Sequence, residues 1–184
     1  FEVNGYVTPY GDSPLDDENV GENVYLNMIN QAYDYLYITT PYLILDDNLQ
    51  TALINAAKRG VDVRIITPGI PDKKIVFRVT RSYYQTLIKH GIRIYEYTPG
   101  FIHAKQILSE NAAIVGTINM DYRSFYLHYE NGVWMSGKKI QEDIRQDFAY
   151  LFETCEEISY ESWKHRPRRW KLIQPILNLF STLF

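Results

Sequence analysis

The chain has 184 residues, 46% of them hydrophobic and 15% aromatic, a composition that excludes intrinsic disorder and allows one domain with a sizeable core. The net charge of −3 hides an asymmetry, because residues 162–184 hold five basic residues and no acidic one, which leaves −8 for residues 1–161. An acidic body is a poor match for a nucleic-acid backbone, and the single cysteine excludes an internal disulfide.

In the first half of the chain, apolar residues at helical spacing alternate with short β-rich runs. Turn-forming residues such as Pro41, Gly60, Pro68 and Gly91 end these segments. Strands that alternate with helices of this length predict crossover units and a largely parallel sheet. The expected segments are an irregular start over 1–14, helices over 16–32, 47–59 and 71–90, and strands over 35–39, 61–67 and 92–97.

The pattern changes after residue 100. Strands are expected over 101–109, 112–115 and 130–136, the first two joined by a hairpin-like turn at Glu110 and Asn111, and a helix is expected from 139 to about 157. The predicted fold class is α/β, with a mixed, largely parallel β-sheet flanked by helices on both faces. We expect one domain over 1–161 and a separate tail over 162–184.

The tail has the pattern of a basic amphipathic helix. Its apolar residues recur at spacings of three and four, from Trp170 to Phe184, although Pro175 would kink or break the helix. Such a helix suits an anionic membrane surface, and packing on its own domain or on a neighbouring one is an equally good interpretation. The expected membrane-contact residues are Lys164, Arg166, Arg168, Arg169, Trp170 and Lys171. No apolar run reaches the roughly 18–20 residues that a transmembrane helix needs.

His103 and Lys105 lie two residues apart in the strand expected over 101–109. Side chains at that spacing point to the same face of a strand. A neutral imidazole beside a fixed ammonium suits attack on a phosphodiester, since the nitrogen attacks phosphorus while the cation neutralises the non-bridging oxygens. We expect no metal here, because the ammonium repels a divalent cation, and no cofactor, because the common nucleotide-binding loop is missing.

A longer pattern around these residues resembles a known family. His103-x-Lys105, an acid at 110 and Gly116-Thr117-x-Asn119 resemble the signature of the phospholipase D superfamily. The runs over 101–105 and 116–125 resemble the second catalytic domain of bacterial cardiolipin synthases, as do shorter runs at 40–42, 60–64, 81–83 and 94–97. The resemblance covers about residues 35–136 and implies a phospholipase D-like catalytic domain.

The resemblance also implies a role for each matching residue. His103 would attack phosphorus or protonate the leaving alkoxide. Lys105 and Asn119 would hold phosphate oxygens, with Thr117 as a weaker helper. Glu130 falls where the family has a carboxylate that accepts a hydrogen bond from the other ring nitrogen of the histidine and so fixes its tautomer.

Two positions depart from the family pattern. Glu110 stands where the family usually has Asp and is counted with His103 and Lys105 in the catalytic motif. Because Glu shapes a turn poorly, either the turn differs or position 110 mainly gives support. His128 stands where these synthases commonly carry Asn, and the sequence suggests no role for it.

The chain supplies one such motif, whereas displacement through a covalent intermediate needs two proton-handling groups. The other histidines, at 90, 128 and 165, lack a lysine two residues on. The resemblance implies that the second set comes from a similar domain of the same longer chain or from a homodimer partner. The resemblance to the second synthase domain, in a chain that begins with Phe1 and not with Met, leads us to expect the C-terminal half of a longer enzyme.

The implied activity is phosphatidyl transfer. One phosphatidylglycerol would donate its phosphatidyl group to the histidine, release glycerol, and pass the group to a second phosphatidylglycerol. The implied place is the cytoplasmic face of a bacterial cytoplasmic membrane, with an anionic membrane surface and no nucleic acid as partner. Two alternatives stay open: a homodimeric single-motif phosphodiesterase or nuclease of the superfamily, and a catalytically silent membrane-docking half. The acceptor alcohol also stays open.

Overall fold

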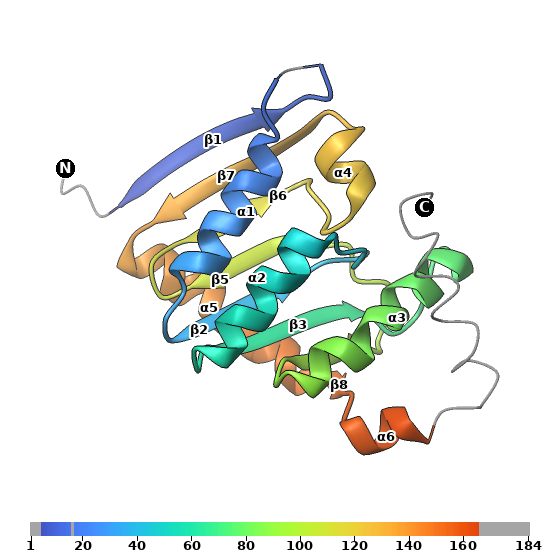
Figure 1. Ribbon diagram of the computed structural model, residues 1–184. Coiled ribbons are helices and arrows are strands. Elements are labelled where there is room, and N and C mark those ends of the chain that lie inside the picture. Colours follow the sequence, from blue (N-terminus) through green and yellow to red (C-terminus); the bar gives the residue numbers. More distant parts are fainter. Residues whose placement is uncertain (1–4, 16, 166–184) are drawn as a thin grey trace.

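The computed structural model describes residues 5–15 and 17–165, which form an eight-stranded sheet covered by helices on both faces (Figure 1). The strands are β1 (Tyr6–Asp12), β2 (Tyr35–Thr39), β3 (Asp62–Pro68), β4 (Arg93–Tyr97), β5 (Gln106–Ser109), β6 (Ala113–Gly116), β7 (Glu130–Ser136) and β8 (Cys155–Glu157). The helices are α1 (Val20–Gln31), α2 (Asp47–Lys58), α3 (Lys74–Lys89), α4 (Tyr122–Tyr126), α5 (Lys138–Thr154) and α6 (Tyr160–Lys164).

The strand order across the sheet is β1-β7-β6-β5-β2-β3-β4-β8, which confirms the mixed α/β class. The parallel pairs are β2 with β3 and β3 with β4, which are the strands connected through α2 and α3. The other five neighbouring pairs are antiparallel. The parallel part of the sheet is therefore smaller than the alternation of strands and helices in the first half of the chain predicts. The short turn between β5 and β6 permits only an antiparallel pair there.

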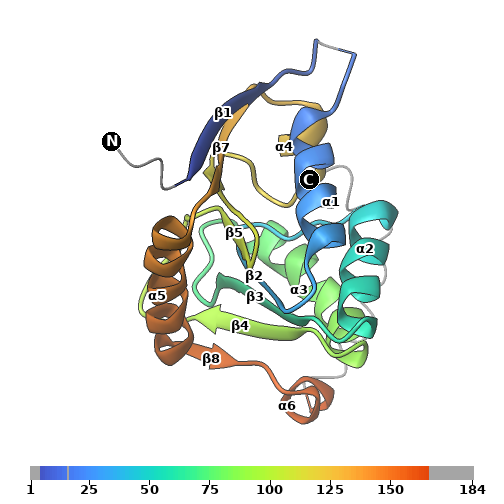
Figure 2. The same ribbon diagram turned by 90° about the vertical axis from the view of Figure 1, so that its left-hand side faces the viewer.

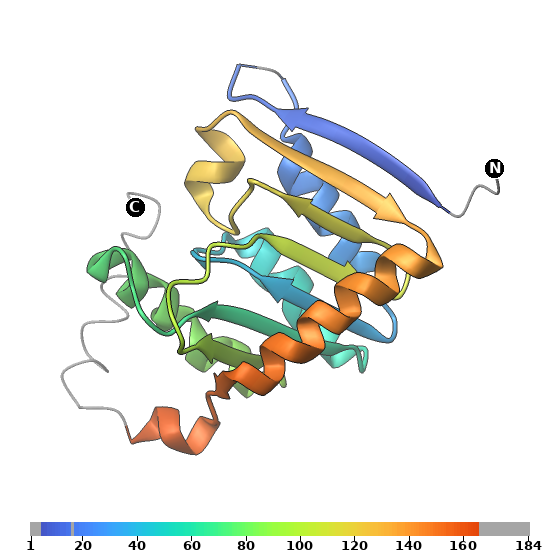
Figure 3. The same ribbon diagram turned by 180° about the vertical axis from the view of Figure 1, so that it is seen from behind.

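Each face of the sheet has its own apolar core. Helices α1 and α2 cover one face, and α5 crosses the other (Figures 2 and 3). Between these two helices and the sheet lie fully buried aliphatic side chains such as Ile29 of α1, Leu53 of α2 and Leu36 of β2. On the other face, Phe148 of α5 packs against the ring of Tyr37 in β2, with 5.8 Å between the ring centroids. The sheet is therefore a rigid platform whose strand ends can hold functional side chains.

The helix ends follow the sequence signals closely. Asp46 directly precedes the helix expected over 47–59, and its side chain accepts the backbone N–H of Leu49 at 2.8 Å and caps α2. Gly60 and Gly91 end α2 and α3 with φ of 96° and 89°, values that favour glycine. The first helix is shorter than expected, because it begins at Val20 and not at residue 16.

The two outermost strands were not expected. The segment over 1–14, predicted as irregular, contains β1, which pairs with β7 at the edge of the sheet. An edge strand tolerates Pro9, the residue that hides this strand in the sequence. The helix expected to reach about 157 ends at Thr154, and the next three residues form β8 beside β4. Glu157 of β8 is held by Arg93 of β4 at 2.7 Å, a contact that helical periodicity does not reveal.

The short helix α6 spans the boundary that the sequence predicts between residues 161 and 162. Trp163 of this helix is buried and packs on Tyr84 of α3, with 5.2 Å between ring centroids. The predicted amphipathic helix of the tail, from Arg166 onward, lies outside the described residues. Within 5–15 and 17–165, the structure contains no helix with the length and apolar character needed to span a bilayer.

Candidate active site

Three separate chain segments meet on the side of the sheet where the parallel strands β2, β3 and β4 end, on the right in Figure 1. The loop from β4 to β5 carries His103 and Lys105, the end of β6 leads to Thr117 and Asn119, and β7 begins with Glu130. The side chains of these five residues line one open groove of about 510 Å³. Gly116 lets the end of β6 approach β7, because a Cβ atom there would lie 2.5 Å from the carbonyl oxygen of Asn131.

The contact between His103 and Lys105 has a different origin from the one expected. The strand expected from residue 101 begins only at Gln106, so alternation along a strand does not align the two side chains. Instead the Lys105 ammonium turns back and donates a hydrogen bond of 2.7 Å to the His103 carbonyl oxygen. Its Nζ then lies 3.0 Å from Nδ1 and 3.2 Å from Nε2 of the His103 ring.

This contact lowers the affinity of the His103 ring for a proton. Partial desolvation in the groove lowers the pKa of His103, and the Lys105 ammonium lowers it further. Lys105 is itself only 8% exposed, and burial lowers its pKa, although Glu130 and Asp121 act in the opposite direction. The site therefore favours a neutral imidazole beside a buried ammonium, the state that nucleophilic attack on a phosphodiester requires.

Asn119 is held at the groove by residues that the sequence reasoning passed over. Its Nδ2 donates to Ser124 Oγ at 3.0 Å, and its side chain also hydrogen-bonds the Asp121 carboxylate. Asp121 accepts the backbone N–H of Ser124 at 2.8 Å and caps α4. Asp is a favoured N-cap residue, and this signal could have revealed α4.

The run at 40–42 has a structural role in the same place. Thr40 Oγ1 accepts the backbone N–H of Met120 at 3.0 Å and donates to the Tyr42 carbonyl at 2.8 Å. The backbone N–H of Ile44 donates to the Met120 carbonyl at 2.8 Å. These bonds tie the loop after β2 to the loop after β6, and they fix the backbone that presents Asn119.

Glu130 has other partners than the expected one. Its Oε2 accepts the hydroxyl of Thr117, and its Oε1 lies 3.5 Å from Nδ1 of His128. In the described residues it makes no hydrogen bond with His103, whose ring nitrogens face Lys105. The negative charge of Glu130 acts to raise the pKa of Lys105. His128, for which the sequence suggested no role, faces Glu130.

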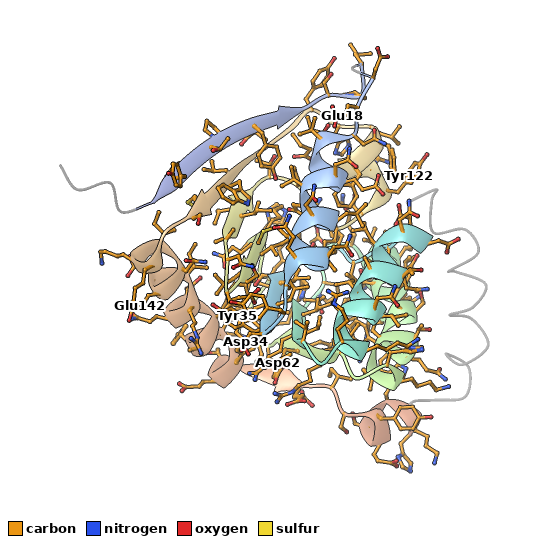
Figure 4. The ribbon with its side chains drawn as sticks, turned by 60° about the vertical axis from the view of Figure 1, so that its left-hand side comes forward. Glu18, Asp34, Tyr35, Asp62, Tyr122 and Glu142 are labelled. Atoms are coloured by element: carbon orange, nitrogen blue, oxygen red, sulfur yellow. The ribbon has the colours of Figure 1, made fainter. Side chains whose placement is uncertain are left out.

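Glu110 lies outside the groove, which corrects its place among the catalytic residues. Its carboxylate accepts backbone N–H groups of Tyr33 at 3.1 Å and of Asp34 and Tyr35 at 3.3 Å. It follows the far end of β5, roughly 16 Å of extended chain from Lys105. Figure 4 shows Asp34 and Tyr35 well away from Tyr122, the first residue of α4. The longer Glu side chain bridges the β5–β6 turn to the start of β2 and gives support.

The part of the chain that the structure describes holds no group of three or more His, Cys, Asp or Glu side chains arranged to bind a metal ion. The groove instead offers the Lys105 ammonium and the Asn119 amide, which are donor groups for an anion, while the Thr117 hydroxyl is bonded to Glu130. Such a set of groups can bind a phosphate group next to an imidazole nitrogen.

Comparison with known proteins agrees with this chemistry. A family model described as "Cardiolipin synthase, PLD-like domain" matches residues 25–152. An uncharacterised protein of Streptococcus mutans is 48% identical over 182 residues, which is 98% of this chain and 40% of the relative. A cardiolipin synthase of Halalkalibacterium halodurans is 38% identical over 165 residues, which is 89% of this chain and 33% of the relative.

Solved structures share the fold. Nuc of Salmonella typhimurium, a phospholipase D family member, has a TM-score of 0.71 and 18% identity, over 84% of this chain and 99% of that one. Phosphatidylserine synthase of Haemophilus influenzae has a TM-score of 0.75 and 16% identity, over 98% of this chain and 48% of that one. Among the curated relatives, the chain spans 40% of the length of the Streptococcus mutans protein and 33% of the length of the Halalkalibacterium halodurans protein.

Replacing Glu110 tests its supporting role. Glu110→Ala removes the acceptor of three backbone N–H groups, so we expect the free energy of unfolding to fall by about 1–3 kcal/mol in urea denaturation. Glu142→Ala, at an exposed residue beside Glu110, is the control and is expected to stay within about 0.5 kcal/mol. The pKa of His103, followed by NMR, stays the same in both variants. A shift of that pKa in Glu110→Ala would return Glu110 to the site.

The pKa of His103 tests the electrostatics of the groove. We expect His103 to titrate below its ordinary value of 6.5, so that its ring is neutral at pH 7. Lys105→Met removes a positive charge and therefore raises this pKa, but leaves it below 6.5, because desolvation is the larger cause. Lys89→Met, at the far end of α3, is the control without effect. An NMR titration in which Lys105→Met lowers or does not change the pKa contradicts this account.

Proposed function

The chain belongs to the cardiolipin synthase family of phospholipase D-like domains, and we propose that it forms one half of a phosphatidyl-transfer active site. In the first step a histidine nitrogen bonds to the phosphorus of phosphatidylglycerol, and the bond from phosphorus to the oxygen of the headgroup glycerol breaks. In the second step the terminal hydroxyl of another phosphatidylglycerol gives up its proton and attacks the same phosphorus, the phosphorus–nitrogen bond breaks, and cardiolipin forms. One phosphodiester replaces another, so the exchange needs no nucleotide.

The observation that carries the proposal is the contact between the His103 ring and the buried Lys105 ammonium. A ring with a lowered pKa keeps a lone pair free for phosphorus at neutral pH. The ammonium and the Asn119 amide, which both line the groove, stabilise the charge that grows on the phosphate oxygens in the transition state. These are the roles that a metal ion fills in most phosphoryl-transfer enzymes.

The leaving alkoxide takes a proton, which calls for a second imidazole that is protonated when the first is neutral. In the described residues, His103 is the histidine that lines the groove. We propose that the second histidine belongs to a similar domain, either in the same longer chain or in a homodimer partner. The greater length of the curated relatives supports a second domain in one chain.

The substrate is a lipid, so we propose that the protein works on the cytoplasmic face of the bacterial membrane. The basic stretch from Lys164 to Lys171 supports this place, since each cation near an anionic bilayer adds attraction. The acidic character of residues 1–161 opposes nucleic acid as the substrate.

The direct test replaces His103 in the longest natural protein that carries this chain. With phosphatidylglycerol vesicles and product analysis by mass spectrometry, we expect His103→Ala to reduce cardiolipin formation by about a thousandfold or more. His90→Ala, at the far end of α3, is the matched control with activity near that of the unchanged protein. Full activity of His103→Ala refutes the proposed role. Cleavage of an oligonucleotide in place of lipid transfer would identify the alternative phosphodiesterase.

A further inference from the structure

The segment that leads into α3, together with its first turn, presents an unusual surface to solvent. Ile70 and Ile75 are 50% and 52% exposed, and the two lysines between them, Lys73 and Lys74, are exposed as well. We call these four side chains the α3 patch. Large aliphatic side chains are exposed here next to ammonium groups, on a body whose net charge is strongly negative.

The α3 patch borders the catalytic groove. The first turn of α3 lies beyond the end of β3. The loop from β4 to β5, which carries His103 and Lys105, lies on this same side of the sheet (Figures 1 and 3). The Tyr42 hydroxyl donates to Asp72 at 2.5 Å, and its ring lies 5.5 Å from Lys73 Nζ. The Tyr42 carbonyl accepts the hydroxyl of Thr40, which in turn accepts the backbone N–H of Met120, next to Asn119. The charges of Asp72 and Lys73 both reach His103 and act on its pKa in opposite directions.

The α3 patch and the adjacent Asp72 together carry a net positive charge, from two lysines and one carboxylate. Neither lysine forms an ion pair with a carboxylate within residues 5–15 and 17–165. The neighbouring acid, Asp72, is bonded to the Tyr42 hydroxyl and to the backbone N–H of Lys73. The first turn of α3 contains no acidic residue, although the helix dipole favours acids there. The two lysines are therefore available to an external anion.

We infer that the α3 patch docks the active-site edge of the protein on an anionic lipid bilayer. The lysines would bind lipid phosphates, while the two isoleucines enter the boundary between headgroups and acyl chains. This docking places the groove at the depth of the phosphodiester on which it acts. The inference rests on the proposed function for its purpose, but the binding itself does not require catalysis.

A bilayer fits this surface better than the other macromolecules. Nucleic acid offers phosphates, but it offers no apolar layer for Ile70 and Ile75, and the acidic body repels it. A bilayer offers lipid phosphates directly above an apolar layer, so neighbouring basic and apolar side chains can bind to it together. The combination of exposed isoleucine and exposed lysine is what identifies lipid.

Vesicle binding of the 184-residue chain tests the inference. With vesicles of phosphatidylcholine and phosphatidylglycerol at low salt, we expect Lys73→Ser with Lys74→Ser to weaken partitioning about 25-fold. Lys58→Ser with Lys89→Ser removes the same charge at the last turns of α2 and α3, on the opposite edge, and is expected to change partitioning less than threefold. His103→Ala binds like the unchanged chain, which separates a failure of docking from a failure of catalysis.

A site-specific probe gives a second readout that reports on the α3 patch itself. In a Cys155→Ser background, bimane attached to Ile75→Cys is expected to shift to the blue with these vesicles, and bimane attached to Lys89→Cys is not. Equal partitioning of the two double variants together with an unshifted probe at 75 overturns the inference. So does lysine-dependent binding of an oligonucleotide without a change in vesicle binding, which would make the patch a nucleic-acid surface.

Discussion

The burial of the Lys105 ammonium is the constraint on which the site depends. A buried cation is costly unless nearby groups stabilise it. Here the His103 carbonyl oxygen accepts one of its hydrogen bonds, and Glu130 and Asp121 stabilise its charge. Its Nζ also lies 3.0 Å from Nδ1 of the His103 ring. The ammonium thus makes the groove attractive to an anion and, together with the larger effect of desolvation, lowers the pKa of His103.

The fold serves this constraint by bringing three chain segments to one edge of the sheet. Thr40 fixes the backbone at Met120, and Asp121 fixes the start of α4, so that Asn119 faces the groove from a rigid loop. The crossover helices α2 and α3 place the ends of the parallel strands at this same edge. Because α3 also begins there, the surface that we assign to lipid binding adjoins the phosphate-binding donors.

Much of this architecture could be predicted from local sequence signals. The cap at Asp46 and the glycines at 60 and 91 gave the ends of α2 and α3, and the residues that line the groove were found by their motif. What could not be predicted depends on partners distant in the sequence. The strand at Cys155–Glu157 exists because β4 is beside it, and the role of Glu110 depends on backbone amides 75 to 77 residues away. The partners of Glu130 also come from tertiary contacts that a motif does not encode.

The central claim is that Lys105 and Asn119 bind one tetrahedral anion in front of His103. A crystal structure of the protein with tungstate, an oxyanion of phosphate-like shape, tests this claim most directly. The account predicts tungstate oxygens within hydrogen-bond distance of Lys105 Nζ and the Asn119 amide, with a His103 ring nitrogen directed at tungsten. Tungstate bound elsewhere while this groove stays empty at saturating concentration, or Lys105 turned away from the bound anion, would contradict it.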